Sequence, residues 1–331
     1  MIDFSNENLD GMDFSNVTLD GSDFSRTTLV KSKFINGSYR ECLFEDITPA
    51  FEGSSSDFSG STFRNVEGEG VYITESTLDD VSFSEGDHEI ALWGCTSNRL
   101  ELTEMLTTLN INGGRINIYG KDCIVDSSEF EARVTMQLRA TQATFCSFIN
   151  SLFYLYADDS NINNMRFLES EGTIKIDPKT ACDDLDVRGG KIHIISGKPL
   201  MNFRFRGGCW LKFYDPTRCF NSGSFGKGKF SFLNRSTSIK DSRLKGSDLL
   251  GDKGIQDFKG TSTTFEGVTF VGFIFNNSRF SDCTFENVTF YQCDLGKTSF
   301  VRCRLNNVDF RTSNTLKVSL HQTQHTGVKG L

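Results

Sequence analysis

Proline, tryptophan and histidine are scarce in this chain of 331 residues, which has four, two and four of them. No apolar run reaches the roughly 18 residues that a membrane-spanning helix needs. The first residues, MIDFSNENLDG, lack the basic and apolar regions of a secretory signal. These absences favour a protein that is made in a cytosol and does not span a membrane.

Motifs of catalytic and metal sites are also missing. The ten cysteines form no C-x-x-C pair, which leaves zinc ribbons and thioredoxin-like sites without support. GSFGKGKF, at 223–230, has Phe230 where a phosphate-binding loop needs Ser or Thr. His321 and His325 have no acidic or cysteine ligand nearby in the sequence. We therefore expect no cofactor, no metal and no enzymatic activity, and cysteines that are reduced and buried.

Phenylalanine is abundant instead, with 31 residues, and large apolar residues recur at every fifth position in two blocks. The first block is Phe4, Leu9, Phe14, Leu19, Phe24, Leu29, Phe34, Tyr39 and Phe44. The second is Phe265, Phe270, Phe275, Phe280, Phe285, Phe290, Leu295, Phe300, Leu305 and Phe310. Two places before these residues stand mostly smaller or medium residues, such as Met12, Val17, Ser22 or Cys293, with Phe273 before Phe275. Residues two apart in extended chain point to the same side, so each pair is predicted to face inward.

This pattern resembles the pentapeptide-repeat family. The resemblance is carried by DFS at 13–15 and 23–25, LDG at 9–11 and 19–21, and NVTFYQCDLGKTSFVRCRLNNVDF at 287–310. It implies a right-handed, four-sided parallel β-helix with about twenty residues per coil. Residues twenty apart should then stack, with Phe4, Phe24 and Phe44 in one column and Phe265, Phe285 and Leu305 in another. The family favours Ala at the small inward position, whereas this chain uses Val, Ser, Thr or Cys.

The middle of the chain loses the five-residue period but keeps short alternating strands. They begin at 71, 90, 116, 134, 152, 173, 191, 210 and 229, and from Ile116 onward they lie about 18 to 20 residues apart. Glycine-rich corners precede several of them. This spacing predicts one strand per turn of a solenoid, so a single β-helix is expected rather than two domains.

The expected organisation is an all-β fold with one continuous β-helix over 1–310. Regular coils occupy 1–48, acidic transitional coils 49–110, irregular coils 111–260 and regular coils 261–310, and a cap or tail follows at 311–331. Segments 46–57 and 251–263 are predicted to bulge as loops, which is where specific contacts of a rigid protein usually lie.

Charge is unevenly distributed. Residues 1–110 hold 6 Lys/Arg and 21 Asp/Glu, whereas the segment from Gly189 to Gly260 holds 14 and 5. The predicted acidic partner-binding residues are Asp3, Asp10, Asp13, Asp20 and Asp23. The predicted basic partner-binding residues are Arg204, Arg206, Lys212, Arg218, Lys227 and Lys229. A basic surface could contact an acidic partner, an anionic membrane or nucleic acid. No nucleic-acid-binding motif is present, so a protein partner is the stronger expectation and direct nucleic-acid binding the weaker one.

Three functions remain open. The leading hypothesis is a non-catalytic interaction scaffold, similar to the recognition region of bacterial effectors that are injected into host cells. The alternative is a mimic of DNA that occupies gyrase or another DNA-binding enzyme, as the resemblance to gyrase-protecting pentapeptide-repeat proteins implies. A β-helix lyase or hydrolase, with Asp158 and Asp159 or Asp183, Asp184 and Asp186 as its carboxylates, is the third. The expected location is the cytoplasm of a bacterial or phage-infected cell, or a host cell after injection.

Overall fold

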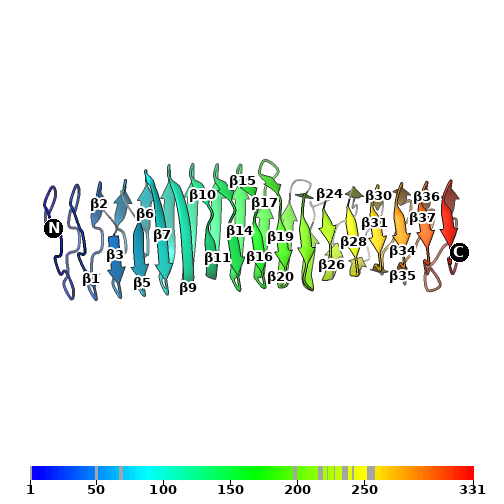
Figure 1. The fold of residues 1–331 in the computed structure, drawn as a ribbon, viewed down its shortest axis with the longest axis horizontal. Coiled ribbons are helices and arrows are strands. Elements are labelled where there is room, and N and C mark those ends of the chain that lie inside the picture. The colour runs from blue at the N-terminus through cyan, green and yellow to red at the C-terminus, as the bar shows by residue number, and fades with distance from the viewer. Residues whose placement is uncertain are drawn as a thin grey trace. The chain divides into compact units, whose positions relative to one another are not determined.

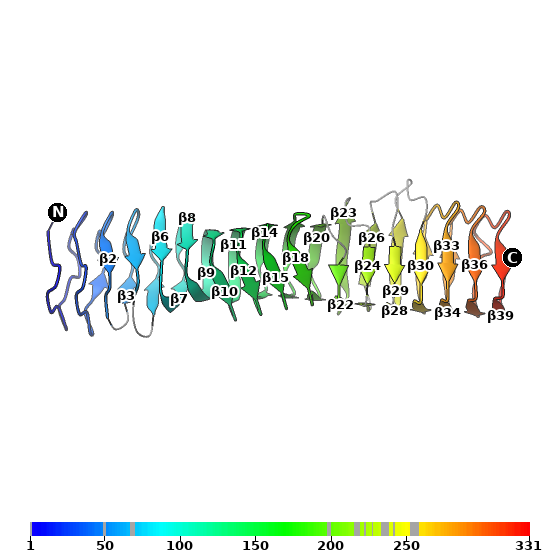
Figure 2. The same cartoon turned by 90° about the horizontal axis from the view of Figure 1, so that it is seen from above.

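The computed structural model describes residues 2–48, 51–66, 70–196, 200–214, 219–221, 223–226, 228–232, 238–240, 242–251 and 258–331. Within these ranges all regular structure is β-strand, and no helix is long and apolar enough to cross a membrane. The chain divides into two compact units, residues 1–162 (unit 1) and 163–331 (unit 2). In each unit parallel strands stack coil upon coil as a β-solenoid (Figures 1 and 2). The predicted all-β solenoid is confirmed, whereas the continuity of the helix over 1–310 stays a prediction.

Unit 1 contains strands β1 to β15, of which the last reaches into unit 2. They are β1 Phe34–Ile35, β2 Leu43–Glu45, β3 Phe51–Ser54, β4 Thr62–Arg64, β5 Val71–Thr74, β6 Val81–Ser84, β7 Asp87–Trp93, β8 Thr96–Thr103, β9 Leu106–Lys121, β10 Ile124–Asp126, β11 Glu129–Arg139, β12 Gln142–Thr144, β13 Ser147–Ile149, β14 Leu152–Asp158 and β15 Asn161–Asn163.

Unit 2 contains strands β16 to β39. They are β16 Arg166–Leu168, β17 Glu171–Ile176, β18 Ala181–Asp183, β19 Asp186–Arg188, β20 Lys191–Ser196, β21 Leu200–Met201, β22 Arg204–Arg206, β23 Cys209–Tyr214, β24 Cys219–Asn221, β25 Ser224–Phe225, β26 Gly228–Phe232, β27 Ser238–Lys240, β28 Arg243–Lys245, β29 Ser247–Gly251, β30 Lys259–Thr261, β31 Thr264–Glu266, β32 Thr269–Val271, β33 Arg279–Ser281, β34 Thr284–Glu286, β35 Thr289–Tyr291, β36 Ser299–Val301, β37 Arg304–Asn306, β38 Ser319–His321 and β39 Gln324–Thr326.

The core of each unit is built from stacked side chains. In unit 1 the ring centroids of Phe4 and Phe24 lie 4.9 Å apart, and those of Phe24 and Phe44 lie 5.0 Å apart. These distances match the spacing of about 4.8 Å between neighbouring strands. In unit 2 Phe265 pairs in register with Phe285, which pairs with Leu305. Both predicted columns are therefore confirmed.

The corners of the regular coils have left-handed backbone at every fifth residue. In the first block they are Asn6, Gly11, Asn16, Gly21, Arg26, Lys31, Asn36, Glu41 and Asp46. A left-handed residue reverses the side toward which the chain bends, and Gly and Asn adopt this conformation at little cost. Each five-residue unit is consequently one side of a coil with its large apolar residue at the centre.

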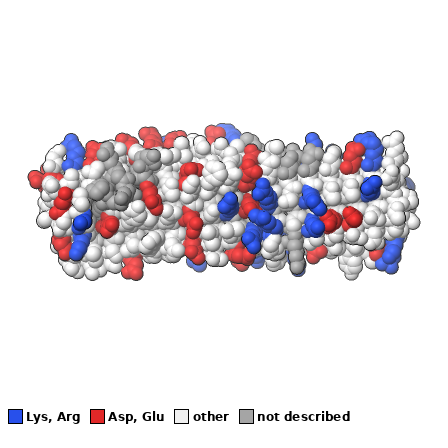
Figure 3. All heavy atoms as spheres, in the orientation of Figure 1, with Lys and Arg blue, Asp and Glu red and all other residues white. Residues whose placement is uncertain are grey.

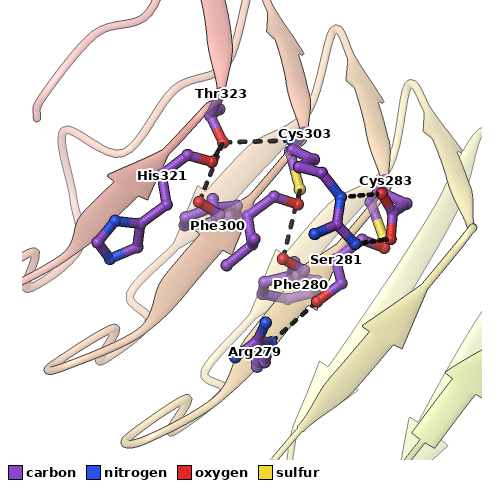
Figure 4. Close-up of polar contacts among 11 residues, drawn as sticks. Arg279, Phe280, Ser281, Cys283, Phe300, Cys303, His321 and Thr323 are labelled. Carbon is purple, nitrogen blue, oxygen red and sulfur yellow. Dashed lines mark hydrogen bonds and ion pairs between the residues drawn. The ribbon is translucent and has the colours of Figure 1, made fainter.

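The small inward position explains why this chain uses Ser, Thr and Cys. The hydroxyl of Thr323 accepts a hydrogen bond from the amide of Cys303 (3.2 Å) and donates one to the carbonyl of Phe300 (3.0 Å), as Figure 4 shows. The thiol of Cys303 donates in the same way to the carbonyl of Phe280 (3.4 Å). A polar atom at this position thus bonds to backbone groups at a corner of the preceding coil. Nine described cysteines are free and buried, as expected.

Corners are lost in the middle of unit 1. Between Gly86 and Asp122 the left-handed corners lie eight to ten positions apart instead of five, at Gly94, Glu104 and the adjacent pair Gly113 and Gly114. Where a corner is absent, two neighbouring short sides of a coil therefore join into one long strand. The nine strands expected in the middle of the chain are confirmed, and the loss of corners is the reason why the five-residue period is absent between Gly86 and Asp122.

Long strands of neighbouring coils form a wide flat face in each unit. In unit 1 it consists of β8 and the parts of β9, β11 and β14 that pair in series at 115–121, 133–139 and 152–158. In unit 2 it consists of β17, β20, β23, β26 and β29. These faces present long rows of outward side chains on a rigid backbone.

The loop predicted at 46–57 is wrong for the described part of that segment. Residues 51–54 form β3, and Phe51 is only 1% exposed. Gly53 pairs with Phe34, so the large and the small inward residue have exchanged places in this coil. In the other predicted loop, 251–263, Lys259–Thr261 is a strand and 252–257 lie outside the described residues.

The end coils differ from the expectation that every repeat pair faces inward. Met12 and Val17 are 48% and 38% exposed, because no earlier coil covers them in the structure. Residues 311–331 form a further coil in which β38 and β39 pair with β36 and β37. This coil covers the strand edges before it, and Leu316 lies exposed in it.

Candidate interaction faces

The five predicted acidic residues lie on more than one side of unit 1. Asp3 bridges to Asp23 in the next coil, which bridges to Leu43. Asp13 bridges instead to Lys33. The carboxylates are thus distributed around the first coils, and the only described backbone bridge between two of them joins Asp3 to Asp23.

Each of these aspartates also stabilises the backbone. Asp3, Asp13 and Asp23 accept hydrogen bonds of 2.8 to 2.9 Å from the amides two residues ahead. Asp10 and Asp20 accept from the amides of Val30 and Arg40 in the next coil, at 2.8 and 3.0 Å. Hydrogen bonds from Ser5 and Ser15 lower the pKa of Asp3 and of Asp13. Asp3 and Asp13 are therefore charged at neutral pH. All five carboxylates have a structural role in the corners.

The predicted basic residues of unit 2 lie on two sides. Arg204 and Arg206 lie on β22, and Arg206 forms an ion pair of 2.7 Å with Asp186. Lys212 and Lys229 lie on β23 and β26 of the flat face. Arg218 and Lys227 lie outside the described residues. On the side drawn in Figure 3, Lys and Arg side chains gather over the first half of unit 2 with acidic side chains among them.

Trp210 is the centre of the flat face of unit 2. Its indole is 41% exposed, and the ammonium groups of Lys191 and Lys212 lie 4.9 and 5.6 Å from its ring centroid. Lys229 follows Trp210 in register on the next strand. Burial, Lys212 and Lys191 lower the pKa of His193. We call Lys191, Trp210, Lys212 and Lys229 the Trp210 face.

The flat face of unit 1 carries arginine and tyrosine. Its outward residues include Arg99, Arg115, Tyr119, Lys121, Arg133, Gln137, Arg139, Tyr154 and Tyr156, which we call the Arg/Tyr face. Arg115 pairs in register with Arg133. Tyr119 pairs with Gln137, which pairs with Tyr156. The two arginines are thus neighbours across strands, and the two tyrosines share a row with Gln137.

This face is basic although unit 1 is acidic. Residues 1–162 hold 10 Lys/Arg and 27 Asp/Glu, a net charge of −17. From residue 65 to 162 there are five Lys/Arg, and all five lie on the Arg/Tyr face. Of the 16 Asp/Glu in the same range only Glu101 and Asp158 lie within its strand segments. The folding of the chain has therefore separated the charges.

A shallow groove of about 500 Å³ lies on the Arg/Tyr face. Its lining includes Arg99, Glu101, Tyr119, Lys121, Arg139, Tyr156 and Asp158. Arg99 forms an ion pair with Glu101, and its guanidinium lies 5.8 Å from the ring centroid of Tyr119. The groove combines aromatic surface with charged hydrogen-bonding groups.

The carboxylates considered for a lyase do not form a facing pair. Asp158 ends β14 beside Arg139 in register, and Asp159 is the left-handed corner residue that follows. Asp183 and Asp186 belong to β18 and β19, and Asp184 is a corner residue between them. No group of three or more possible metal ligands is found among the described residues.

The Arg/Tyr face was not among the predicted sites. Its signal was in the sequence, because Arg115 and Arg133 lie 18 positions apart and Tyr119 and Gln137 do as well. The strand spacing of the middle region was recognised, but the outward residues were not aligned across successive strands. The net charge of a segment does not show on which face its cations lie, so the sum for this acidic segment did not reveal its basic face.

The comparison with family models agrees with the repeat at both ends of the chain. The family model for pentapeptide repeats matches eight copies, over residues 2–35, 261–296 and 278–314. A search of curated proteins finds no match. Among solved structures, the chain is similar to HetL, a pentapeptide repeat protein involved in heterocyst differentiation regulation from the cyanobacterium Nostoc sp. strain PCC 7120. The identity is 10%, the TM-score is 0.17, and the match covers 98% of this chain and 90% of that one.

Proposed function

We propose that this chain, which carries pentapeptide repeats toward both ends, is a non-catalytic scaffold that binds a protein partner on the Arg/Tyr face. The observation that supports this function is the gathering of all five Lys/Arg of residues 65–162 on one flat face. Solubility alone does not require such segregation, since a uniform polar coat would serve equally well.

The composition of the face is typical of protein interfaces. Arginine and tyrosine are enriched where partners bind tightly, while lysine and the acids are depleted. The face has four arginines and three tyrosines but one lysine and two carboxylates. The strands beneath are paired on both sides, so little backbone entropy is lost when a partner binds.

The Trp210 face supplies a second exposed aromatic residue among cations in unit 2. We propose that it adds contacts to the same or another partner. This function resembles that of an effector recognition region, and it fits the cytoplasm of a bacterial or phage-infected cell or of an injected host cell.

Affinity capture followed by mass spectrometry tests the proposal. The bait is the full chain, and the variant is Arg115→Glu with Arg133→Glu. The matched control is Arg26→Glu with Lys31→Glu, two exposed cations at corners of the first coils. A partner lost by the first pair and kept by the second is the expected result. A partner kept by both contradicts the proposed face.

The DNA-mimic alternative rests on the net charge of −17 in unit 1. It predicts that the chain inhibits or protects gyrase in a supercoiling assay, and that reversing Asp3, Asp13 and Asp23 abolishes the effect. The scaffold predicts a partner that survives those reversals. No response of gyrase at stoichiometric excess would remove the alternative.

A further inference from the structure

The groove on the Arg/Tyr face has cations in its middle and carboxylates at its two ends. Glu101 lies on β8 and Asp158 on β14, the first and the last of the four strands that line the groove. Lys121 on β9 and Arg139 on β11 lie between them and pair in register. Three steps between strands of about 4.8 Å give a length of about 14 Å. This charge pattern selects a ligand by its length.

The cations of the groove differ in whether they form an ion pair with a residue of this chain. Arg99 is already paired with Glu101, and the ammonium of Lys121 lies 3.6 Å from Asp122. Arg139 forms no ion pair with any described residue. Its guanidinium is therefore available for a carboxylate, which it can bind with two parallel hydrogen bonds.

We propose that this groove binds a short acidic segment of a protein in extended conformation, and this inference rests on the proposed scaffold function. Carboxylates of the segment contact Arg139 and Lys121, and an aromatic or apolar side chain between them packs on Tyr119 and Tyr156. The backbone amides and carbonyls of the middle strands already pair with neighbouring strands. Recognition therefore uses side chains of the sheet and adds no strand to it.

A long polyanion fits the groove poorly. Glu101 aligns through Tyr119 and Gln137 with Tyr156, two positions before Asp158. The diagonal from Glu101 to Asp158 is therefore about 16 Å, which about five residues of an extended peptide span at about 3.3 Å each. A nucleic acid strand carries a charge on every nucleotide and would continue over both carboxylates, which repel it. The two terminal carboxylates instead suit amide or hydroxyl donors that flank a short acidic segment.

Fluorescence anisotropy with the labelled peptide Gly-Glu-Tyr-Glu-Gly tests the inference. The full chain should bind it in preference to Gly-Gln-Tyr-Gln-Gly. Replacing both Lys121 and Arg139 by alanine should weaken binding at least about fivefold, as the loss of two exposed charge pairs implies. The control, Arg26→Ala with Lys31→Ala, should leave it unchanged. Equal binding of the two peptides, or no effect of the groove variant, overturns the inference.

A second arm tests the selection by length. The natural chain should bind a thymidylate oligonucleotide of about 20 nucleotides more weakly than the acidic peptide. The variant Glu101→Gln with Asp158→Asn should gain affinity for the oligonucleotide. Tighter binding of the oligonucleotide to the natural chain contradicts a protein ligand. If the peptide fails to bind while Arg115→Glu with Arg133→Glu still removes the captured partner, the inference is wrong and the scaffold function stands.

Discussion

The hydroxyl of Ser61 donates a hydrogen bond of 2.7 Å to the carbonyl of Tyr39, 22 positions earlier in the chain. The same oxygen accepts a bond of 3.0 Å from the amide of Cys42. The corner between Tyr39 and Cys42 is therefore closed by a side chain of the next coil. Polar atoms at the small inward position thus connect successive coils through their backbones.

Replacing Ser61 by alanine should destabilise unit 1 by about 2 to 3 kcal/mol, because two buried backbone groups lose their partner. The control is Ser32→Ala. Ser32 donates to the carbonyl of Leu9 at 2.7 Å, but that carbonyl also accepts from the amide of Met12 at 3.1 Å. In urea unfolding, Ser32→Ala should lower the free energy of unfolding by less than Ser61→Ala does, by about 1 kcal/mol. Equal losses would mean that the hydroxyl does not close the corner.

The aromatic column of unit 2 provides a second test. Phe285 is fully buried, and its ring centroid lies 4.7 Å from that of Phe265. Phe285→Ala removes this contact and leaves a cavity, so unfolding should be easier by about 3 to 5 kcal/mol. Tyr291→Ala removes an exposed aromatic ring in the neighbouring strand β35 and should change stability little. A thermal scan in which Phe285→Ala melts like the natural chain would contradict the stacked core.

The sequence predicted those features that depend on residues close together along the chain, and it did not predict those that depend on contacts between coils. The five-residue period of Phe4 to Phe44 depends only on neighbours along the chain, and it was sufficient for the fold and both columns. The Arg/Tyr face forms because the middle coils lack some of the left-handed corner residues. Without such a corner a strand continues, so more side chains lie on the same face. Arg115 and Arg133 are neighbours because the chain completes one coil in the 18 positions between them, and the uninterrupted strand from Arg133 to Arg139 places Arg139 on the same face. The sequence places both arginines 18 positions apart, but a count of net charge by segment does not reveal their pairing.

Buried thiols should make stability depend on alkaline pH. Burial raises the pKa of the Cys146 thiol from 9.0 to about 12. The unfolded chain therefore loses this proton more readily than the folded one. The stability that the thiol contributes is present below pH 9 and is lost as the pH rises toward 12.

The melting temperature should consequently fall between pH 9 and pH 11. Cys146→Ala removes one of these groups and should make the fall less steep, because Ala cannot ionise. Several other buried thiols, among them Cys209, have raised pKa values, so the change is partial. A reagent for thiols should label the native chain slowly at pH 8 and completely only after denaturation. An unchanged pH dependence in the variant would show that Cys146 does not titrate as expected.

In β3 the large and the small inward residue, Phe51 and Gly53, have exchanged places, and this exchange leads to the last prediction. In the preceding coil Ser32 is the small inward residue and Phe34 the large one, whereas in β3 Phe51 stands first and Gly53 second. The ring of Phe51 still lies 4.9 Å from that of Phe34. A Cβ atom at Gly53 would lie 2.6 Å from the ring of Phe58. The space beside Gly53 is therefore already filled by aromatic rings.

Phe51→Ser should lower the free energy of unfolding by about 3 to 5 kcal/mol because it leaves a cavity. Gly53→Phe should lower it by about 1 to 3 kcal/mol because it overpacks the core. The double variant restores the order of the preceding coil and places a ring between Phe34 and Ile73, the register partners of Gly53. It should recover a large part of the summed loss, because neighbouring changes are not additive. Urea unfolding of all three variants gives the coupling energy. A double variant that loses the full sum would mean that the ring cannot move to the central position. The backbone of this coil would then differ as well, because Phe34 and its partner Gly53 lie 19 positions apart and not 20.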